Sequence, residues 1–259
     1  MSWNIYFASD HVNRPRVRAR ILSDNHHLAM DSLPQELIDT IIDNVPESSL
    51  SSCSLVAKRW RRKSQRRAFD TMSFSSEDKI NRWCTDIPRD SDGISSYIHH
   101  VSIEDISSWA EPALFSRILD ILSSLTTLLV SETEIPDELP GHISRGELGK
   151  GITTLYLCFS HCTVTTLASM ILSLPDLKEL SVEYCGVTLE EPLPAYSATP
   201  QRGPLNSLEL HGYMEGVGEA LARLRLISSH LSLHLHIPDI EQLLMISSET
   251  VVKLQLHGV

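Results

Sequence analysis

The sequence has no apolar run close to the roughly 18–20 residues that a transmembrane helix needs. It also lacks a secretory signal, because residues 1–30 contain no apolar stretch and carry four arginines separated by single residues (Arg14, Arg16, Arg18 and Arg20). The five cysteines are odd in number and form no Cys-x-x-Cys pair, which indicates free thiols in a reducing compartment. We therefore expect a protein of the cytoplasm or nucleus with no membrane partner.

Motifs that carry chemistry are also missing. The chain has no Gly-rich phosphate loop, no Gly-x-Ser-x-Gly and no His-Glu-x-x-His. Gly216 and Gly218 form a Gly-x-Gly pair without the rest of a dinucleotide-binding fingerprint. The acidic pairs Glu190–Glu191 and Glu104–Asp105 are typical of solvated charge. The sequence predicts that the protein is not an enzyme, has no catalytic residues and binds no cofactor.

Charge is distributed unevenly along the 259 residues, whose net charge is −11. Residues 1–70 hold 11 Lys and Arg against 8 Asp and Glu, a balance of +3, whereas residues 71–259 hold 11 against 25, a balance of −14. This asymmetry predicts two regions with different partners. The acidic second region disfavours nucleic acid as a ligand, because phosphate backbones require a cationic surface.

The first region has the pattern of three short helices. Asp31 or Ser32 can cap a helix that begins near Pro34, and Pro46 ends it. Ser48 or Ser49 can cap a second helix, and a third runs from about residue 57 to 68 with Trp60 as its large apolar residue. In the first helix the apolar residues recur with the helical period: Leu37, Ile38, Ile41, Ile42 and Val45. About 40 residues cannot bury a self-sufficient core, so we expect the module to dock on a partner or on the rest of the chain.

The residues of this module form the string Leu33-Pro34-x-Glu36-Leu37, then Ile41-Ile42, then Cys53-Ser54-Leu55-Val56-x-x-x-Trp60. The string covers about a sixth of the chain and resembles an F-box, most closely the form common in fungal F-box proteins. The resemblance implies that the module binds the Skp adaptor of a cullin-RING ubiquitin ligase. The residues expected to face the adaptor or to hold the helices together, without a division between the two roles, are Leu33, Pro34, Leu37, Ile38, Ile41, Leu50, Leu55, Val56 and Trp60. The alternative is an amphipathic hairpin packed on its own domain.

A basic run, residues 58–67, contains seven Lys and Arg and allows three interpretations. It can be the solvated face of the third helix, a nuclear-localisation patch or a phosphate contact. We favour the solvated face, because no aromatic or Gly pattern accompanies the charge.

The second region contains a repeated apolar pattern, Φ-x-x-Φ-x-Φ, whose second apolar position falls at 101, 128, 155, 180, 208, 233 and 254. The steps are 27, 27, 25, 28, 25 and 21 residues, close to the leucine-rich-repeat range of about 20–29. Helical spacing is present at 113–123, 165–174, 218–227 and 239–246, whereas 131–151 and 186–204 have the composition of loops. Residues 72–74 and a helix at 77–86 form a candidate degenerate first repeat.

We therefore predict an α/β protein with a disordered segment at 1–30, an F-box at 31–72 and an irregular leucine-rich-repeat solenoid at 73–259. Its parallel strands line the inner face, and its helices and loops lie outside, because each one-sided unit must stack on its neighbours. The last strand lies within three residues of the end of the sequence and has no polar cap. An uncovered solenoid end favours either a longer natural chain or pairing with another chain.

Strand residues that alternate with the apolar pair should point away from the core and form the recognition surface. One predicted row is Tyr156, Ser181, Glu209, His234 and Gln255; the next is Cys158, Glu183, His211, His236 and His257. The candidate substrate-binding residues are Tyr156, Glu183, Glu209, His211, His234 and His236. The histidines of the second row suggest a metal site or a pH-sensitive patch, but flat adjacent strands rarely give tetrahedral ligation, so we expect no metal.

Together these patterns predict a substrate-recognition adaptor of an SCF-type ubiquitin ligase, whose repeats bind a protein substrate that the sequence does not name. The alternative is a repeat scaffold, unconnected with a ligase, in which the F-box-like helices only cap the solenoid. Capping requires Leu37, Ile41 and Trp60 to be buried within the chain. Docking on an adaptor requires an apolar patch from them to remain exposed.

Overall fold

The computed structural model describes residues 33–86, 93–135, 149, 151–188, 205–212, 217, 221, 228–234, 241, 244–245 and 251–257. The chain divides into two compact units, residues 1–70 and 71–259. Each unit is described by itself below. The segment 1–30, for which disorder is expected, lies outside the described residues.

The first unit consists of three helices, α2 (Gln35–Asn44), α3 (Glu47–Val56) and α4 (Lys58–Ala68). The predicted boundaries hold, but the predicted serine caps are wrong. Pro34 and Pro46 occupy the N-cap positions of α2 and α3, and neither helix has a side-chain cap bond. Proline suits this place because its fixed φ leads into the helix and it lacks an N–H that would need a partner.

A small apolar core holds the three helices together. It consists of Ile38 and Ile42 from α2, Leu50 from α3 and Trp60 from α4, each at most 6% exposed. Arg67 of α4 adds a polar link, because its guanidinium donates to the backbone carbonyls of Ile42 and Val45. Carbonyls at the C-terminal end of a helix have no partner within the helix, so Arg67 satisfies α2 there and complements its dipole.

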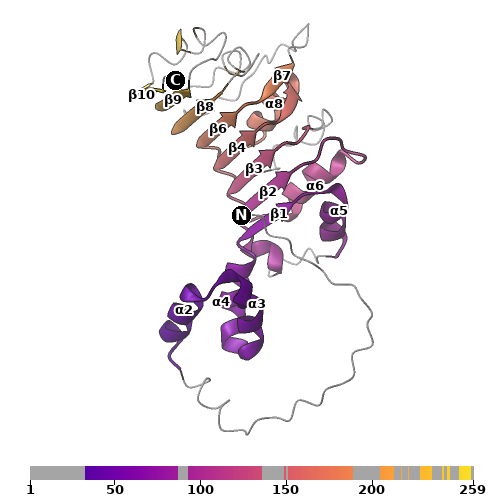
Figure 1. Ribbon diagram of the computed structural model, residues 1–259, viewed down its shortest axis with the longest axis vertical. Helices are drawn as coiled ribbons and strands as arrows, with labels where there is room; N and C mark the ends of the chain where they lie inside the picture. Colours follow the sequence, from indigo (N-terminus) through magenta and orange to yellow (C-terminus); the bar gives the residue numbers. More distant parts are fainter. Residues whose placement is uncertain are drawn as a thin grey trace. The chain divides into compact units, whose positions relative to one another are not determined.

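The second unit is a parallel sheet of eight strands in the order β1-β2-β3-β4-β6-β8-β9-β10 (Figure 1). The strands are β1 (Thr71–Phe74), β2 (His100–Glu104), β3 (Thr127–Ser131), β4 (Thr154–Cys158), β6 (Glu179–Glu183), β8 (Ser207–His211), β9 (His230–His234) and β10 (Lys253–His257). Successive strands are neighbours, as expected for a stacked repeat. The predicted α/β class and the stack of parallel strands are confirmed.

Three α-helices, α5 (Glu77–Asp86), α6 (Ala113–Ile121) and α8 (Val164–Leu172), lie on one side of the sheet (Figure 1). A 3-10 helix, η1 (Ile94–Tyr97), precedes β2. The helices expected at 113–123 and 165–174 are confirmed, as is the first repeat formed by β1 and α5. Of the segments 218–227 and 239–246, the described residues Leu221, Glu241, Leu244 and Met245 are helical. Within the described part of the chain, none of the helices combines the length and apolarity that crossing a bilayer would demand.

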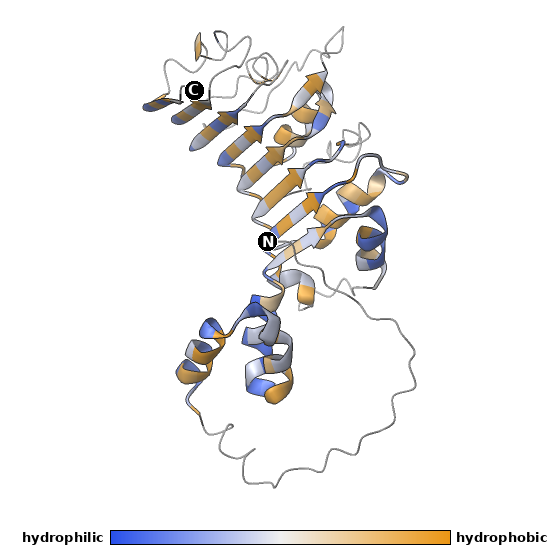
Figure 2. Cartoon of the chain, in the orientation of Figure 1, coloured by the Kyte–Doolittle hydropathy of each residue, from blue (hydrophilic) through white to orange (hydrophobic). Residues whose placement is uncertain are grey.

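The apolar pair of each central strand points into the core. From Val101 to Leu233 these paired positions are at most 2% exposed, and apolar and polar segments alternate along the strands in Figure 2. In β10, by contrast, Leu254 and Leu256 are exposed, and β9 is its strand partner. The alternation follows from the two-residue period of a strand.

One segment predicted to be a loop contains a strand. Gly186–Thr188 forms β7, which pairs in parallel with β5 (His161–Thr163) in a second sheet. Glu134 extends this ladder through an isolated bridge to His161. After β3, β4 and β6 the chain therefore turns and makes a second backbone contact with the neighbouring repeat. The rest of the predicted loops at 131–151 and 186–204 lies largely outside the described residues.

The predicted register of β9 is wrong by two residues. Leu208 pairs with Leu231, not Leu233, and Leu231 pairs with Leu254, so the last two steps are 23 and 23 residues. In the alternation of leucine and polar residues from 230 to 236, a shift of two residues keeps every leucine on the same face. Periodicity alone therefore cannot choose the register. A bridge between Leu205 and Ser228 precedes β9 and belongs to the observed register.

A column of small polar side chains lies buried behind the strand ends. Thr133, Ser160 and Cys185, each two residues beyond a strand, are at most 4% exposed. The side-chain hydroxyl or thiol of each donates to two backbone carbonyls, that of the last residue of its own strand and one of the preceding strand. The Ser160 hydroxyl, for example, lies 3.0 Å from the carbonyl oxygen of Cys158 and 3.3 Å from that of Val130. This is the position that Asn or Cys takes in the leucine-rich-repeat pattern. The column satisfies backbone carbonyls that the turn would otherwise bury without partners.

Candidate interaction surfaces

The nine residues predicted to bind an adaptor fall into two groups in the first unit. Ile38, Leu50 and Trp60 are buried in its core, so they hold the helices together and offer no contact surface. The other six are at least partly accessible: Leu33, Pro34, Leu37, Ile41, Leu55 and Val56. The division that the sequence left open is therefore between three buried core residues, Leu33 packed against that core, and five exposed surface residues.

Two exposed apolar groups stand out on the first unit. Leu37 is 51% and Ile41 is 41% exposed, and their spacing of four residues places them on one face of α2. Leu55, which is 81% exposed, and Val56 end α3. Leu37 and Ile41 meet the condition set for docking, whereas the buried Trp60 does not. Since α2 and α3 each pack on α4, Trp60 serves as their common core contact.

The basic run forms almost all of α4, and part of it has a structural role. Lys63 forms an ion pair with Asp43 of α2 at 3.0 Å, and Arg67 donates to the end of α2. Both contacts lie between the helices of the first unit. The interpretation as a purely solvated face is therefore wrong for these two residues, which join α4 to α2.

Four of the six predicted substrate-binding residues lie on the polar face of the sheet, on β4, β6 and β8. Tyr156 and Ser181 are register partners, and Ser181 pairs in turn with Glu209. Glu183 is the partner of His211, whose Nε2 lies 3.6 Å from Oε2 of Glu209. The structure thus brings Tyr156, Glu183, Glu209 and His211 together on three adjacent strands.

The predicted histidine row requires a correction that follows from the register of β9. His211 and His234 directly follow the partners Leu210 and Leu233, and His234 pairs with His257. The row therefore runs through positions 211, 234 and 257, and Ser232 takes the place in the first row that was predicted for His234. His236, like the side chains of His234 and His257, lies outside the described residues. Among the side chains that the structure does describe, no group of three or more His, Cys, Asp or Glu could hold a metal ion.

Two thiols near this face are poor nucleophiles. Burial, followed by the charge of Glu183, raises the pKa of Cys158, whose Sγ lies 3.9 Å from Oε2 of Glu183. Burial raises the pKa of Cys185 to about 11, against the opposing effect of backbone hydrogen bonds to Ser160 and Glu183. A reactive cysteine needs a lowered pKa and access to solvent, so these sites do not support thiol chemistry.

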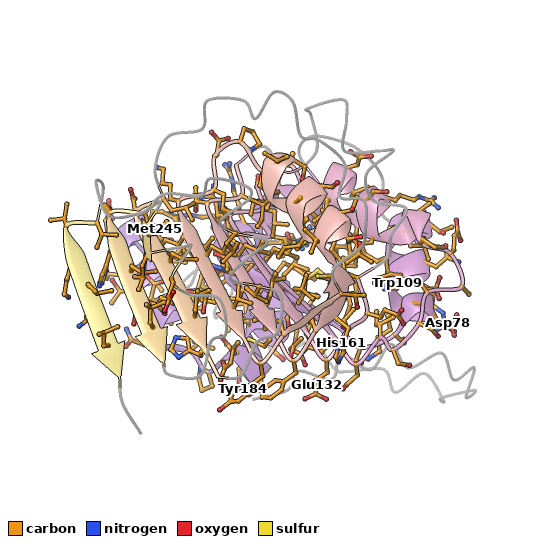
Figure 3. All side chains as sticks on the ribbon, turned by 90° about the horizontal axis from the view of Figure 1, so that it is seen from above. Asp78, Trp109, Glu132, His161, Tyr184 and Met245 are labelled. Carbon is orange, nitrogen blue, oxygen red and sulfur yellow. The ribbon has the colours of Figure 1, made fainter. Side chains whose placement is uncertain are left out.

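A third surface, which the sequence did not indicate, lies where the strands end. The residue that follows each of five consecutive central strands has a left-handed backbone: Asp105, Glu132, Phe159, Tyr184 and Gly212 have φ of 61°, 49°, 49°, 48° and 84°. The N–H of each of the first four donates to the last carbonyl of the next strand, at 2.8–3.2 Å. We call this column of five residues the strand-end column. Figure 3 shows Glu132 and Tyr184, with His161 nearby, along this edge of the sheet.

An exposed aromatic pair stands in the strand-end column. The rings of Phe159 and Tyr184 are stacked with centroids 5.0 Å apart and planes 5° apart, and both residues remain about half exposed. The tyrosine ring covers Gly212, where an added Cβ would lie 2.4 Å from a ring carbon. Beside the pair is a cavity of about 650 Å³ lined by Ser107, Glu132, Thr133, Glu134, Phe159 and His161.

The strand-end column has a weak signal in the sequence. Its members fall four residues after the second apolar position of each repeat, at 105, 132, 159, 184 and 212. Gly212 and, less strongly, Asp105 are of types that favour a left-handed backbone, whereas Glu132, Phe159 and Tyr184 are not, so residue types alone do not reveal the column. Aligning the repeats and asking why one copy has glycine there would have found it.

Comparison with known protein families identifies a domain in the first unit. Residues 30–71 match the F-box domain family, so the chain contains an F-box domain over about a sixth of its length. The fungal subtype stays a prediction.

No curated protein matches the chain. Among solved structures, internalin C2 from Listeria monocytogenes is similar, with 23% identity and a TM-score of 0.36. The similarity covers 62% of this chain and 62% of the internalin. This score is too low to assign a fold or a function to the second unit.

Proposed function

We propose that this protein is a substrate-recognition adaptor of an SCF-type cullin-RING ubiquitin ligase. In this proposal the F-box domain docks on a Skp-type adaptor, and the repeats hold a protein substrate. The observation that carries the proposal is the exposure of Leu37, Ile41, Leu55 and Val56 on a domain that matches the F-box family.

Exposed leucines and isoleucines on so small a domain favour a partner. Burying one such side chain fully is worth about 1.5–3 kcal/mol, so a partner that covers Leu37, Ile41 and Leu55 gains several kcal/mol before the costs of association. Among the described residues of the domain, the apolar core has four buried members, each at most 6% exposed. A partner that binds only the folded form would also stabilise it by mass action.

The second unit would position the substrate and would not itself catalyse a reaction. Its polar sheet face and strand-end column are extended surfaces, of the kind that repeat proteins use for binding. Holding a substrate near the ligase raises its effective concentration for a transfer reaction that other subunits perform. The acidic balance of residues 71–259 favours substrates with basic surfaces over nucleic acid.

Co-elution on size exclusion tests the proposal, with the purified full chain and a purified Skp-type adaptor. Wild type should form a stable complex, and Leu55→Asp should weaken it at least tenfold, because a carboxylate would be buried without a partner. Leu256→Asp is the matched control, since it places the same charge at another exposed leucine, in β10. Absence of a wild-type complex would refute the proposal and favour the scaffold alternative. Equal weakening by both variants would refute the assignment of the surface.

A further inference from the structure

The cavity beside the strand-end column is preorganised by backbone contacts. The N–H of Glu132 donates to Cys158, that of Glu134 to Ile106, and that of Ile135 to His161, at 2.9–3.0 Å. The indole of Trp109 donates to the carbonyl of Glu134 at 2.7 Å. The walls are therefore held by the neighbouring repeats, which is the condition for a precise binding site.

The backbone of this edge stores strain. A left-handed backbone conformation costs a residue with a Cβ roughly 1–2 kcal/mol. Glu132, Phe159 and Tyr184 nevertheless adopt it. Gly212, in the same column, shows that glycine can occupy such a position without that cost. A glycine at these positions would adopt the same backbone conformation without this cost. Strain of this kind concentrates where side chains serve binding, so the outliers point to a function for the edge.

The chemistry of the cavity fits a planar cation. Glu132 and Glu134 are exposed, and within the described residues neither carboxylate has a hydrogen bond or an ion pair. Phe159 presents an exposed aromatic ring to the same cavity, and the ring of Tyr184 continues its stack. A guanidinium stacks on aromatic rings and donates in a fork that matches carboxylates, whereas an ammonium is a point charge with a tighter water shell. Carboxylates and His161 do not form a metal-binding group there.

We propose that the cavity lined by Glu132, Glu134 and Phe159 binds an arginine side chain of the protein substrate, with the Phe159–Tyr184 pair contacting the adjoining residues. The inference rests on the proposed substrate-binding function of the repeats. Charge complementarity selects the occupant, because residues 71–259 carry a balance of −14. A segment of the chain itself, which contains Arg14, Arg16, Arg18 and Arg20, is a competing occupant.

Fluorescence anisotropy tests the inference with the full chain and a labelled peptide of glycine, serine and arginine, in the absence of any adaptor. The arginine peptide should bind at least tenfold more tightly than its citrulline counterpart, which has the same shape without the charge. It should also bind more tightly than the lysine counterpart. Glu132→Gln combined with Glu134→Gln should weaken binding about tenfold or more, and Phe159→Leu about threefold or more.

The control is Asp78→Asn combined with Asp120→Asn, which removes two exposed carboxylates from α5 and α6 and should leave affinity within twofold. Equal weakening by both double variants, or equal binding of the citrulline peptide, would overturn the inference. Binding that emerges only after Arg14, Arg16, Arg18 and Arg20 are replaced by glutamine would overturn it in favour of the chain's own segment. Because no adaptor is present, these outcomes are independent of complex formation by the F-box domain.

Discussion

Leu50 and Leu55 offer a matched test of how the F-box domain divides between core and contact surface. Both are leucines of α3, but Leu50 is fully buried and Leu55 is 81% exposed. Replacing a buried leucine by alanine costs about 2–5 kcal/mol. At about 0.05–0.15 kcal/mol per residue, the 42 residues that match the family have a total stability of roughly 2–6 kcal/mol. Leu50→Ala should therefore remove most of the stability of the domain.

Leu55→Ala should leave the domain folded. With about a fifth of its surface buried, Leu55 loses at most about 0.5 kcal/mol, and the helix propensity of alanine offsets part of that. The affinity of the Leu55→Ala variant for a Skp-type adaptor should nevertheless fall by about five- to thirtyfold, which is the loss expected when a large apolar contact is removed. The two substitutions should thus both impair binding, but for different reasons.

Hydrogen exchange measured by mass spectrometry separates the two effects. In Leu50→Ala, peptides from α2, α3 and α4 should lose protection, while peptides from α6 and β3 serve as an internal control and stay protected. In Leu55→Ala all of these peptides should match wild type. Retained protection in Leu50→Ala, or lost protection in Leu55→Ala, would refute the assignment of one residue to the core and the other to the surface.

The remaining predictions concern single residues. Arg67→Ala should destabilise the F-box domain by about 1–3 kcal/mol in denaturant titrations, because two carbonyls at the end of α2 lose a charged donor; an unchanged midpoint would contradict this role. Cys185 should react with iodoacetamide at pH 8 at least about 100-fold faster after denaturation. Because its folded pKa of about 11 lies above the ordinary thiol value of 9.0, the free energy of unfolding should fall as pH rises from 9 through 11. Gly212→Ala should lower the free energy of unfolding by about 1–2 kcal/mol and displace the ring of Tyr184. Glu132→Gly should raise the free energy of unfolding by about 1 kcal/mol while weakening the binding of the arginine peptide. Thermal melts measure the two changes in stability, and anisotropy measures the binding.

The sequence was informative wherever the signal is local. The three helices of the F-box domain follow from apolar residues at helical spacing, because the period is set by backbone geometry. Pro46 was correctly predicted to end the first helix, but its place at the start of the second was not predicted. The stack of parallel strands follows from the same reasoning at a longer period, since a one-sided unit with a recurring apolar pair can bury that pair only against its neighbours. Both features survive in the structure with small shifts at their ends.

Exposure and register required the tertiary structure. The residues predicted to face the adaptor or to hold the helices together include Ile38 and Ile41 alike, and only the packing of α2 against α4 buries one and exposes the other. The histidine row shifted from His236 to His234 because a slip of two residues preserves the face of every leucine.

The sequence by itself thus determined the class of the protein: an F-box domain followed by stacked strand-and-helix repeats. It did so because hydrophobic period and motif spacing are properties of neighbouring residues. Only the tertiary structure decided where a ligand could bind. The strand-end column with its stacked Phe159 and Tyr184 arises because residues about 25 positions apart meet through backbone pairing, which the repeat spacing signals only weakly.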